Sequence, residues 1–90
     1  MDKLRFAIVG CGSIGKRHIA VIDAEENAVV VAICDNDETR GREQADLYHL
    51  PLYADFQTML NEVEADIISI ATPHHLHAEM SIMANNAGFD

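Results

Sequence analysis

The sequence predicts an α/β fold, a doubly wound parallel sheet of four strands with helices on both faces. Short apolar segments alternate along the chain with segments whose apolar residues recur at helical spacing. The apolar segments contain few polar positions, as is typical of strands that are buried on both faces. With 90 residues, the chain can form one domain and no more.

The first strand and helix are predicted within residues 4–23. Leu4 to Val9 is a run of strand-forming residues that stops at Gly10. From Ser13 to about Asp23 the apolar positions follow helical spacing, which predicts a helix with one buried face. These positions are Ile14, Ile19, Val21 and Ile22.

The second strand is predicted at Val29 to Cys34, a continuous and mostly β-branched apolar run. It ends at an acidic cluster that begins with Asp35. Asp37 can cap the next helix, which we expect to continue to about Ala45 or Tyr48.

The second half of the chain repeats the alternation. Leu50 to Tyr53 reads as a short strand, and Pro51 places it at the sheet edge because proline cannot donate to a central ladder. Asp55 is a plausible cap for a third helix, and Ile67 to Ala71 is the fourth predicted strand. The last predicted helix runs from about His75 to Ala87.

The charge of the chain argues against nucleic acid as a partner. The 6 Lys and Arg residues are outnumbered by 15 Asp and Glu residues, which gives a net charge of -9. A protein that binds a phosphate backbone needs a positive surface. There is also no leader pattern and no apolar run of about 18 residues, so we expect a cytoplasmic protein with no membrane partner.

Several reactive residue types read as structural. Cys11 and Cys34 are too few to suggest a disulfide framework, and we expect two small buried thiols. His18 lies among apolar neighbours on the first predicted helix, which favours a buried histidine with a hydrogen-bond partner. His49 is expected to lie in a surface loop.

Residues 10–15 read Gly-Cys-Gly-Ser-Ile-Gly, a GxGxxG turn. Alone this motif is weak, but here it follows a buried strand, opens a helix and precedes a second strand that ends in an acidic residue. Gly10 permits the sharp turn, Gly12 lets a diphosphate approach the backbone, and Gly15 allows close packing of the helix. The helix start offers N–H groups to the anion. These N–H groups belong to Ser13, Ile14 and Gly15.

Asp35 is the predicted acidic partner of the turn, at the expected separation of about 20 residues from Gly15. Its carboxylate should accept hydrogen bonds from the adenosine ribose and repel the additional phosphate of NADP, and Asn36 beside it joins the predicted cofactor site. NAD is therefore the expected cofactor. NADP remains a minority alternative because Arg40 and Arg42 follow, and a glycine turn used only for packing is the structural alternative.

A histidine-rich segment follows the fourth predicted strand, at the sheet edge where the nicotinamide half of a dinucleotide should lie. Thr72, Pro73, His75 and His77 are the predicted cofactor-binding residues there. His74 and His77 could face one way on a helix and hold a metal. No cysteine or carboxylate accompanies them at close ligand spacing, so we predict no metal site.

These motifs together resemble the N-terminal NAD(P)-binding Rossmann domain of the Gfo/Idh/MocA oxidoreductase family. The resemblance spans nearly the whole chain. It rests on residues 7–15, Arg17-His18, Asp35, Ala71-Thr72-Pro73 and His77. It implies a Rossmann-type fold and hydride transfer between nicotinamide and a sugar, polyol or nucleotide-sugar hydroxyl carbon. One departure is His74, where many members carry asparagine.

The resemblance also implies parts that residues 1–90 do not contain. In the family, a lysine in a Glu-Lys-Pro motif beyond the fourth helix acts on the substrate hydroxyl, and a C-terminal domain holds the substrate. We therefore expect no catalytic residue in this chain, which would be an incomplete dinucleotide-binding domain of a longer, homo-oligomeric parent enzyme. A non-catalytic dinucleotide sensor is the alternative function. A third possibility is a structural fragment whose fourth strand is an open edge that self-associates.

Overall fold

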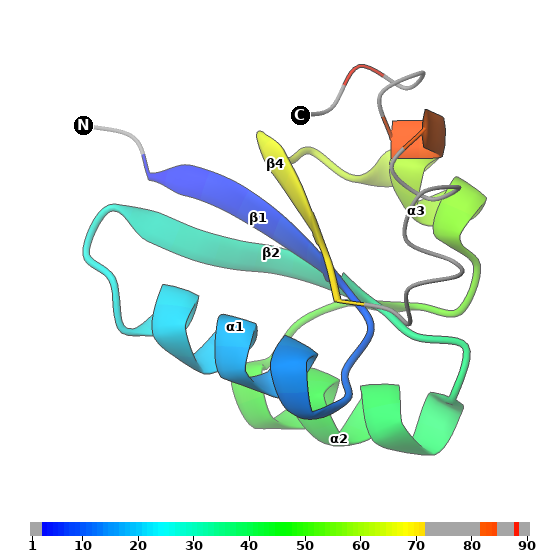
Figure 1. Cartoon of the computed structure of the whole chain (residues 1–90), viewed down its shortest axis with the longest axis horizontal. Helices are drawn as coiled ribbons and strands as arrows, with labels where there is room; N and C mark the ends of the chain where they lie inside the picture. Colours follow the sequence, from blue (N-terminus) through cyan, green and yellow to red (C-terminus); the bar gives the residue numbers. More distant parts are fainter. Residues whose placement is uncertain (1–2, 72–81, 85–87, 89–90) are drawn as a thin grey trace.

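The computed structural model describes residues 3–71, 82–84 and 88 (Figure 1). Its elements are β1 (Leu4–Val9), α1 (Ser13–Asp23), β2 (Ala28–Cys34), α2 (Glu38–Tyr48), β3 (Leu52–Tyr53), α3 (Phe56–Glu62) and β4 (Ile67–Ile70). Residues 82–84 are also helical. The rest of the helix predicted from His75 to Ala87 lies outside the described residues.

The four strands form one parallel sheet in the order β3-β2-β1-β4. Helices α1 and α2 cover one face, and α3 lies on the other (Figure 1). This confirms the predicted α/β architecture with helices on both faces. The short strand after Pro51 lies at one edge of the sheet, as its proline predicts.

Two hydrophobic clusters, one on each face, hold the layers together. Ile8, Ile19 and Ile33 belong to the cluster beneath α1 and α2 and are 0% exposed. Val9 and Met59 belong to the cluster beneath α3. Strand β1 therefore sends alternate side chains into two separate cores, which is why its sequence is apolar without interruption.

A bulge in β2 sets which side chains face each cluster. Phe6 pairs with Val30, but the next residue of β1, Ala7, pairs with Ala32, so Val31 is the extra residue. As a result Val30 and Ile33, three positions apart, pack in the same cluster. The bulge brings the end of β2 level with the end of β1, where the predicted site begins.

Helix α2 ends at Tyr48, within its predicted range, but the strand after it is shorter than predicted. The predicted strand at Leu50 to Tyr53 is shortened to Leu52–Tyr53, because the Leu50 N–H bonds the Ala45 carbonyl at 2.8 Å and finishes the helix. His49 is exposed there, as predicted, in a left-handed conformation with φ 57°.

The predicted apolar face of α1 is only partly correct. Ile19 is buried and Ile22 is packed against the core, but Ile14 and Val21 are more than half exposed. Gly15, Ile19 and Ile22 form the buried stripe at helical spacing.

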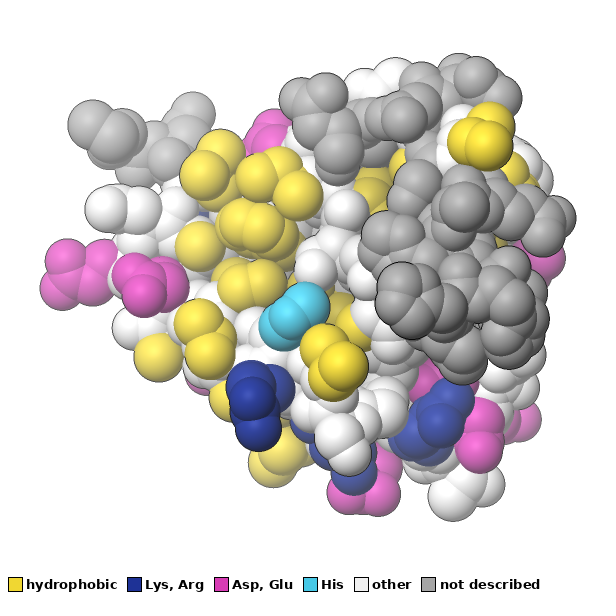
Figure 2. Space-filling view, viewed as in Figure 1, with side chains coloured by type: hydrophobic (Ala, Val, Ile, Leu, Met, Phe, Trp, Pro, Cys, Tyr) yellow, Lys and Arg dark blue, Asp and Glu magenta, His cyan; other side chains and the backbone are white. Residues whose placement is uncertain are grey.

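Some hydrophobic side chains remain at the surface of the molecule (Figure 2). On the face in Figure 2, hydrophobic side chains gather over the strands and α1. Within the described ranges, β4 pairs with β1 alone. No helix among those ranges is long and apolar enough to span a bilayer.

Candidate functional site

The carboxyl ends of the strands open into a pocket of about 690 Å³. In a parallel sheet the loops after successive strands meet at this edge, which is where ligands bind in open α/β folds. The pocket is lined by Val9, Gly10, Gly12, Ser13, Ile14, Cys34, Asp35, Asn36, Arg40, Ala54, Asp55, Phe56 and Ala71.

The three glycines of the turn do different things. Gly10 has φ 91°, a left-handed conformation, and its N–H bonds the Cys34 carbonyl at 2.8 Å. A Cβ at Gly15 would collide with the carbonyl oxygen of Gly10, so α1 packs directly on the turn. Among the described residues, a Cβ at Gly12 would meet no atom within 4 Å, and Gly12 lines the pocket.

Helix α1 begins at this turn without a side-chain cap, since its N-cap residue is Gly12. Helices α2 and α3 are both capped: Asp37 accepts from the Arg40 N–H at 3.1 Å, and Asp55 accepts from the Thr58 N–H at 3.0 Å. The first N–H groups of a helix have no partner within it. Those of α1 therefore remain as donors for an anion in the pocket.

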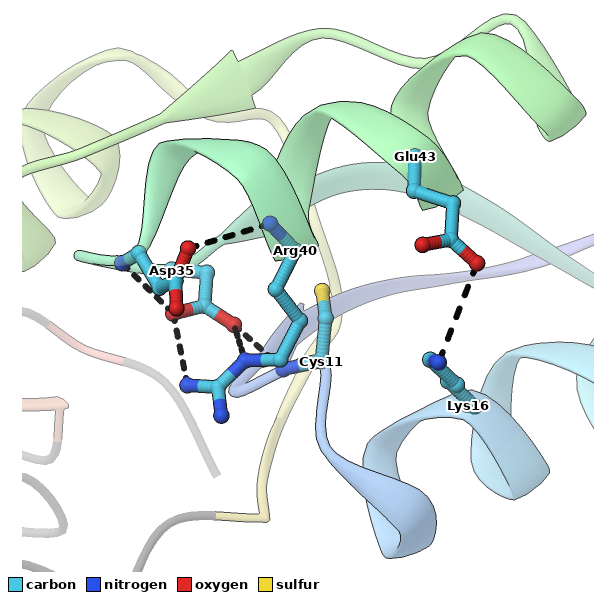
Figure 3. Close-up of polar contacts among 6 residues, drawn as sticks. Cys11, Lys16, Asp35, Arg40 and Glu43 are labelled. Carbon is cyan, nitrogen blue, oxygen red and sulfur yellow. Dashed lines mark hydrogen bonds and ion pairs between the residues drawn. The ribbon is translucent and has the colours of Figure 1, made fainter.

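Asp35 lies at the end of β2 and is the centre of the polar contacts in Figure 3. Its Oδ2 accepts from the Cys11 N–H at 2.8 Å and from Arg40 Nε at 2.8 Å. Its Oδ1 accepts from the Asp37 N–H at 2.9 Å and from Arg40 Nη2 at 3.0 Å. The carboxylate thus ties the glycine turn to the start of α2.

Burial and hydrogen bonding act on Asp35 in opposite directions. Burial alone would raise its pKa, but hydrogen bonds from Arg40 and from the N–H groups of Asp37 and Cys11 outweigh burial and lower the pKa. The same contact raises the pKa of Arg40. Asp35 and Arg40 are therefore both charged at neutral pH and form an ion pair, with Arg40 Nε 2.8 Å from Asp35 Oδ2.

The comparison with protein families agrees with this geometry. A model of the Gfo/Idh/MocA proteins, described as an oxidoreductase family with an NAD-binding Rossmann fold, matches residues 4–90. The chain belongs to this family. The resemblance predicted from the glycine turn and the segments that follow it is therefore confirmed, and with it the Rossmann-type fold.

Three known proteins illustrate the range of relatives of this Gfo/Idh/MocA domain. D-glucoside 3-dehydrogenase of Escherichia coli is 32% identical over 87 residues, which cover 94% of this chain and 25% of that protein. A glycosyl hydrolase family 109 protein of Parabacteroides distasonis is 34% identical over 98 residues, which cover 96% of this chain and 21% of that protein. The WlbA dehydrogenase of Bordetella pertussis, solved in complex with NADH and UDP-GlcNAcA, superimposes with a TM-score of 0.92 at 33% identity.

The superposition on WlbA covers 97% of this chain and 27% of that one. The chain therefore spans between about a fifth and just over a quarter of the length of these relatives. Its similarity is to the nucleotide-binding portion that the family description names.

The structure brings together most of the predicted site residues of the Gfo/Idh/MocA domain. Gly10, Gly12, Ser13, Ile14, Asp35 and Asn36 all line the pocket. Gly15 lies behind the turn as a packing position. Thr72, Pro73, His75 and His77 lie outside the described residues, although Ala71, directly before them, lines the pocket.

Sequence reasoning missed one wall of the pocket. Ala54, Asp55 and Phe56 line it from the loop after β3 and the start of α3. The signal was present, because this loop follows a parallel strand and must emerge at the same sheet edge. The sequence predicts Arg40 only as a partner for an additional phosphate, whereas in the structure it pairs with Asp35.

The two thiols near the pocket both have raised pKa values and are protonated at neutral pH. Burial, followed by the negative charge of Asp35, raises the pKa of Cys11 to about 11 and that of Cys34 to about 12. Both are buried and unbridged, as predicted. Among the residues that the structure describes, no group of three or more His, Cys, Asp or Glu side chains could hold a metal.

Two further contacts hold α1 in place at the site. His18 is half-buried, and its Nδ1 lies 3.2 Å from the Ser69 hydroxyl on β4, so the predicted partner exists. The Nζ of Lys16 lies 3.8 Å from Oε1 of Glu43 on α2 (Figure 3). These contacts link α1 to β4 and to α2.

Proposed function

We propose that this chain is the NAD(H)-binding domain of an oxidoreductase that transfers a hydride between nicotinamide and a hydroxyl carbon of a sugar, polyol or nucleotide sugar. The observation that carries the proposal is the uncapped start of α1, which follows the glycine turn and opens into a pocket bordered by Asp35. Helix N-termini of this kind bind diphosphates.

The residues suit a dinucleotide in a defined direction. The N–H groups of residues 13–15 would hold the diphosphate, and the missing side chain of Gly12 leaves room for it. The adenosine would lie toward Asp35 and Asn36, and the nicotinamide toward Ala71 and the predicted residues 72–77. The bound dinucleotide would supply hydride chemistry, while the residues of this chain bind and orient it.

The same residues favour NAD over NADP. Asp35 is ionised at neutral pH and lies where the ribose 2′ position should be, so its carboxylate would repel an additional phosphate whenever Arg40 is not paired with it. That repulsion supports NAD as the preferred cofactor.

The substrate class is proposed from the relatives. One is named as a D-glucoside dehydrogenase, and another was solved with a nucleotide sugar bound. Because the chain spans about a quarter of their length, we propose that a catalytic lysine and a substrate domain belong to the remainder of a longer protein. The relative named as a glycosyl hydrolase supports sugar substrates as well, although its name states a different net reaction.

Titration of NADH into the protein tests this proposal, with Gly12→Ala as the decisive variant. An alanine Cβ there meets no atom of the described residues within 4 Å and the backbone has φ -72°, so the variant should fold normally. Its methyl group would occupy the diphosphate position, and we expect the dissociation constant for NADH to rise about tenfold or more.

Asn27→Ala is the matched control, because Asn27 is exposed and precedes β2 at the opposite end of the sheet. It should bind NADH like the unaltered protein. If the unaltered protein does not bind NADH at millimolar concentration, or if Gly12→Ala binds it equally well, the proposal is wrong.

A further inference from the structure

The Asp35 carboxylate has no acceptor site left for a ligand. A carboxylate offers about four lone-pair positions, two on each oxygen. All four are used, two by backbone N–H groups and two by the guanidinium of Arg40. Its side chain is accordingly only 2% exposed. A ribose hydroxyl could not reach it in this arrangement.

Of these partners, Arg40 is the one that can leave. The Cys11 and Asp37 N–H groups belong to the backbone of the glycine turn and of the α2 cap. The Arg40 side chain is 44% exposed and lines the pocket. Figure 3 shows its guanidinium beside the Asp35 carboxylate. The guanidinium can move into solvent at the loss of two charge-assisted hydrogen bonds.

We propose that Arg40 is a displaceable cover on Asp35 and that it determines which dinucleotide the site accepts. The inference deepens the proposed function and rests on it. When NAD(H) binds, the two ribose hydroxyls replace the two hydrogen bonds that the guanidinium gives up. Because NAD(H) can bind only after the ion pair between Arg40 and Asp35 has broken, Arg40 lowers the apparent affinity for NAD(H).

The effect on NADP(H) has the opposite sign. An additional phosphate at the ribose 2′ position would be repelled by an uncovered Asp35, but the paired guanidinium neutralises that charge. Arg40 Nη1 donates no hydrogen bond within the described part of the chain, so it remains for a phosphate oxygen. Arg40 therefore reduces the preference for NAD(H) over NADP(H) that Asp35 alone would cause.

Paired titrations of NADH and NADPH with Arg40→Met test this inference. Methionine keeps much of the aliphatic stem and removes the guanidinium. We expect NADH to bind more tightly and NADPH to bind more weakly. If Arg40 is paired with Asp35 in about nine of ten unliganded molecules, the NADH affinity should rise about tenfold. NADH binding that is unchanged or weaker would overturn the inference.

Arg42→Met is the matched control, because Arg42 is exposed on the same helix, carries the same charge and does not line the pocket. It should leave the ratio of the two affinities unchanged, and an equal change of that ratio in both variants would overturn the inference. If Arg40→Met does not fold, Arg40→Lys replaces it. Lysine cannot donate two parallel hydrogen bonds to one carboxylate, so NADH should bind more tightly while NADPH binding is retained.

The failure of the inference can be told apart from failure of the proposed function. If neither the unaltered protein nor any Arg40 variant binds NADH or NADPH, the proposed function itself is wrong. If the unaltered protein binds NADH and removal of Arg40 does not strengthen that binding, only the role of Arg40 is wrong.

Discussion

Asp35 joins the structural and functional arguments at the scale of single residues. Its carboxylate links the glycine turn, the α2 cap and Arg40, so the residue expected to hold the cofactor also holds the local fold. Hydrogen bonds to a charged group are worth about 1.5–3 kcal/mol each when one partner is removed. Substitution of Asp35 therefore tests binding poorly, since it disturbs the fold at the same time.

Asp35 should make the stability of the protein depend on acid pH. Its folded pKa is lower than the unfolded value of about 3.9, so its contribution is fully present above about pH 4 and is lost as the pH falls through the folded pKa. Urea unfolding between pH 7 and pH 2.5 should show the unfolding free energy declining below about pH 4.

The variant Asp35→Asn should be less stable at pH 7 by about 2–3 kcal/mol and should lose part of this acid dependence. Asp55 and Asp66 also have lowered pKa values, so some acid dependence will remain. Asp23→Asn, at an exposed carboxyl that ends α1, is the control and should keep the full dependence. Full dependence in Asp35→Asn as well would contradict the account.

The sequence predicted the position of Asp35 but not its partner. The spacing from the glycine turn identifies the end of β2, because strand and helix lengths in this fold are constrained. The pairing with Arg40 depends on a side-chain conformation across the start of α2, and Arg42 is a second basic residue close after Asp35 in the sequence. Spacing does not select between them.

At the scale of elements, the spacing of apolar residues and the capping aspartates predicted most boundaries of helices and strands. Asp37 and Asp55 cap α2 and α3 as expected, and the apolar runs became β1, β2 and β4. The bulge at Val31 was not predictable, because a continuous apolar run contains no alternation that a one-residue shift would interrupt. The sequence did not predict the exposure of Ile14. Helical spacing alone does not decide whether the row of residues that contains Ile14 or the adjacent row with Gly15, Ile19 and Ile22 faces the core.

Packing of α1 on the turn gives a prediction of its own. A Cβ at Gly15 would collide with backbone, which cannot move aside as a flexible side chain can. Gly15→Ala should lower the unfolding free energy by about 2–3 kcal/mol, at the upper end of typical overpacking costs. Denaturant unfolding measures this effect.

Gly12→Ala is the control for the Gly15 variant, because it replaces the same residue type three positions earlier. It should cost less than about 1 kcal/mol, since its Cβ meets open space and only an N-cap preference is lost. Equal destabilisation of the two variants would contradict the assignment of packing to Gly15 and of open space to Gly12.

At the scale of the whole molecule, the order of the elements places the site. Alternation of strands and helices predicted a parallel sheet with its loops at one edge, and the pocket lies there. The wall made by Ala54 to Phe56 follows from the same topology. The nicotinamide side stays a prediction, because Thr72, Pro73, His75 and His77 lie outside the described residues.

The central claim is that a dinucleotide binds across the glycine turn of this Gfo/Idh/MocA domain. Chemical-shift changes of the backbone amides on addition of NADH test it most directly, because they report each N–H group separately. We predict the largest changes at residues 13–15 and at Asn36, with little change at Arg5 and Asp66 at the opposite end of the sheet. Changes confined to that opposite end, or no change at residues 13–15, would contradict the account.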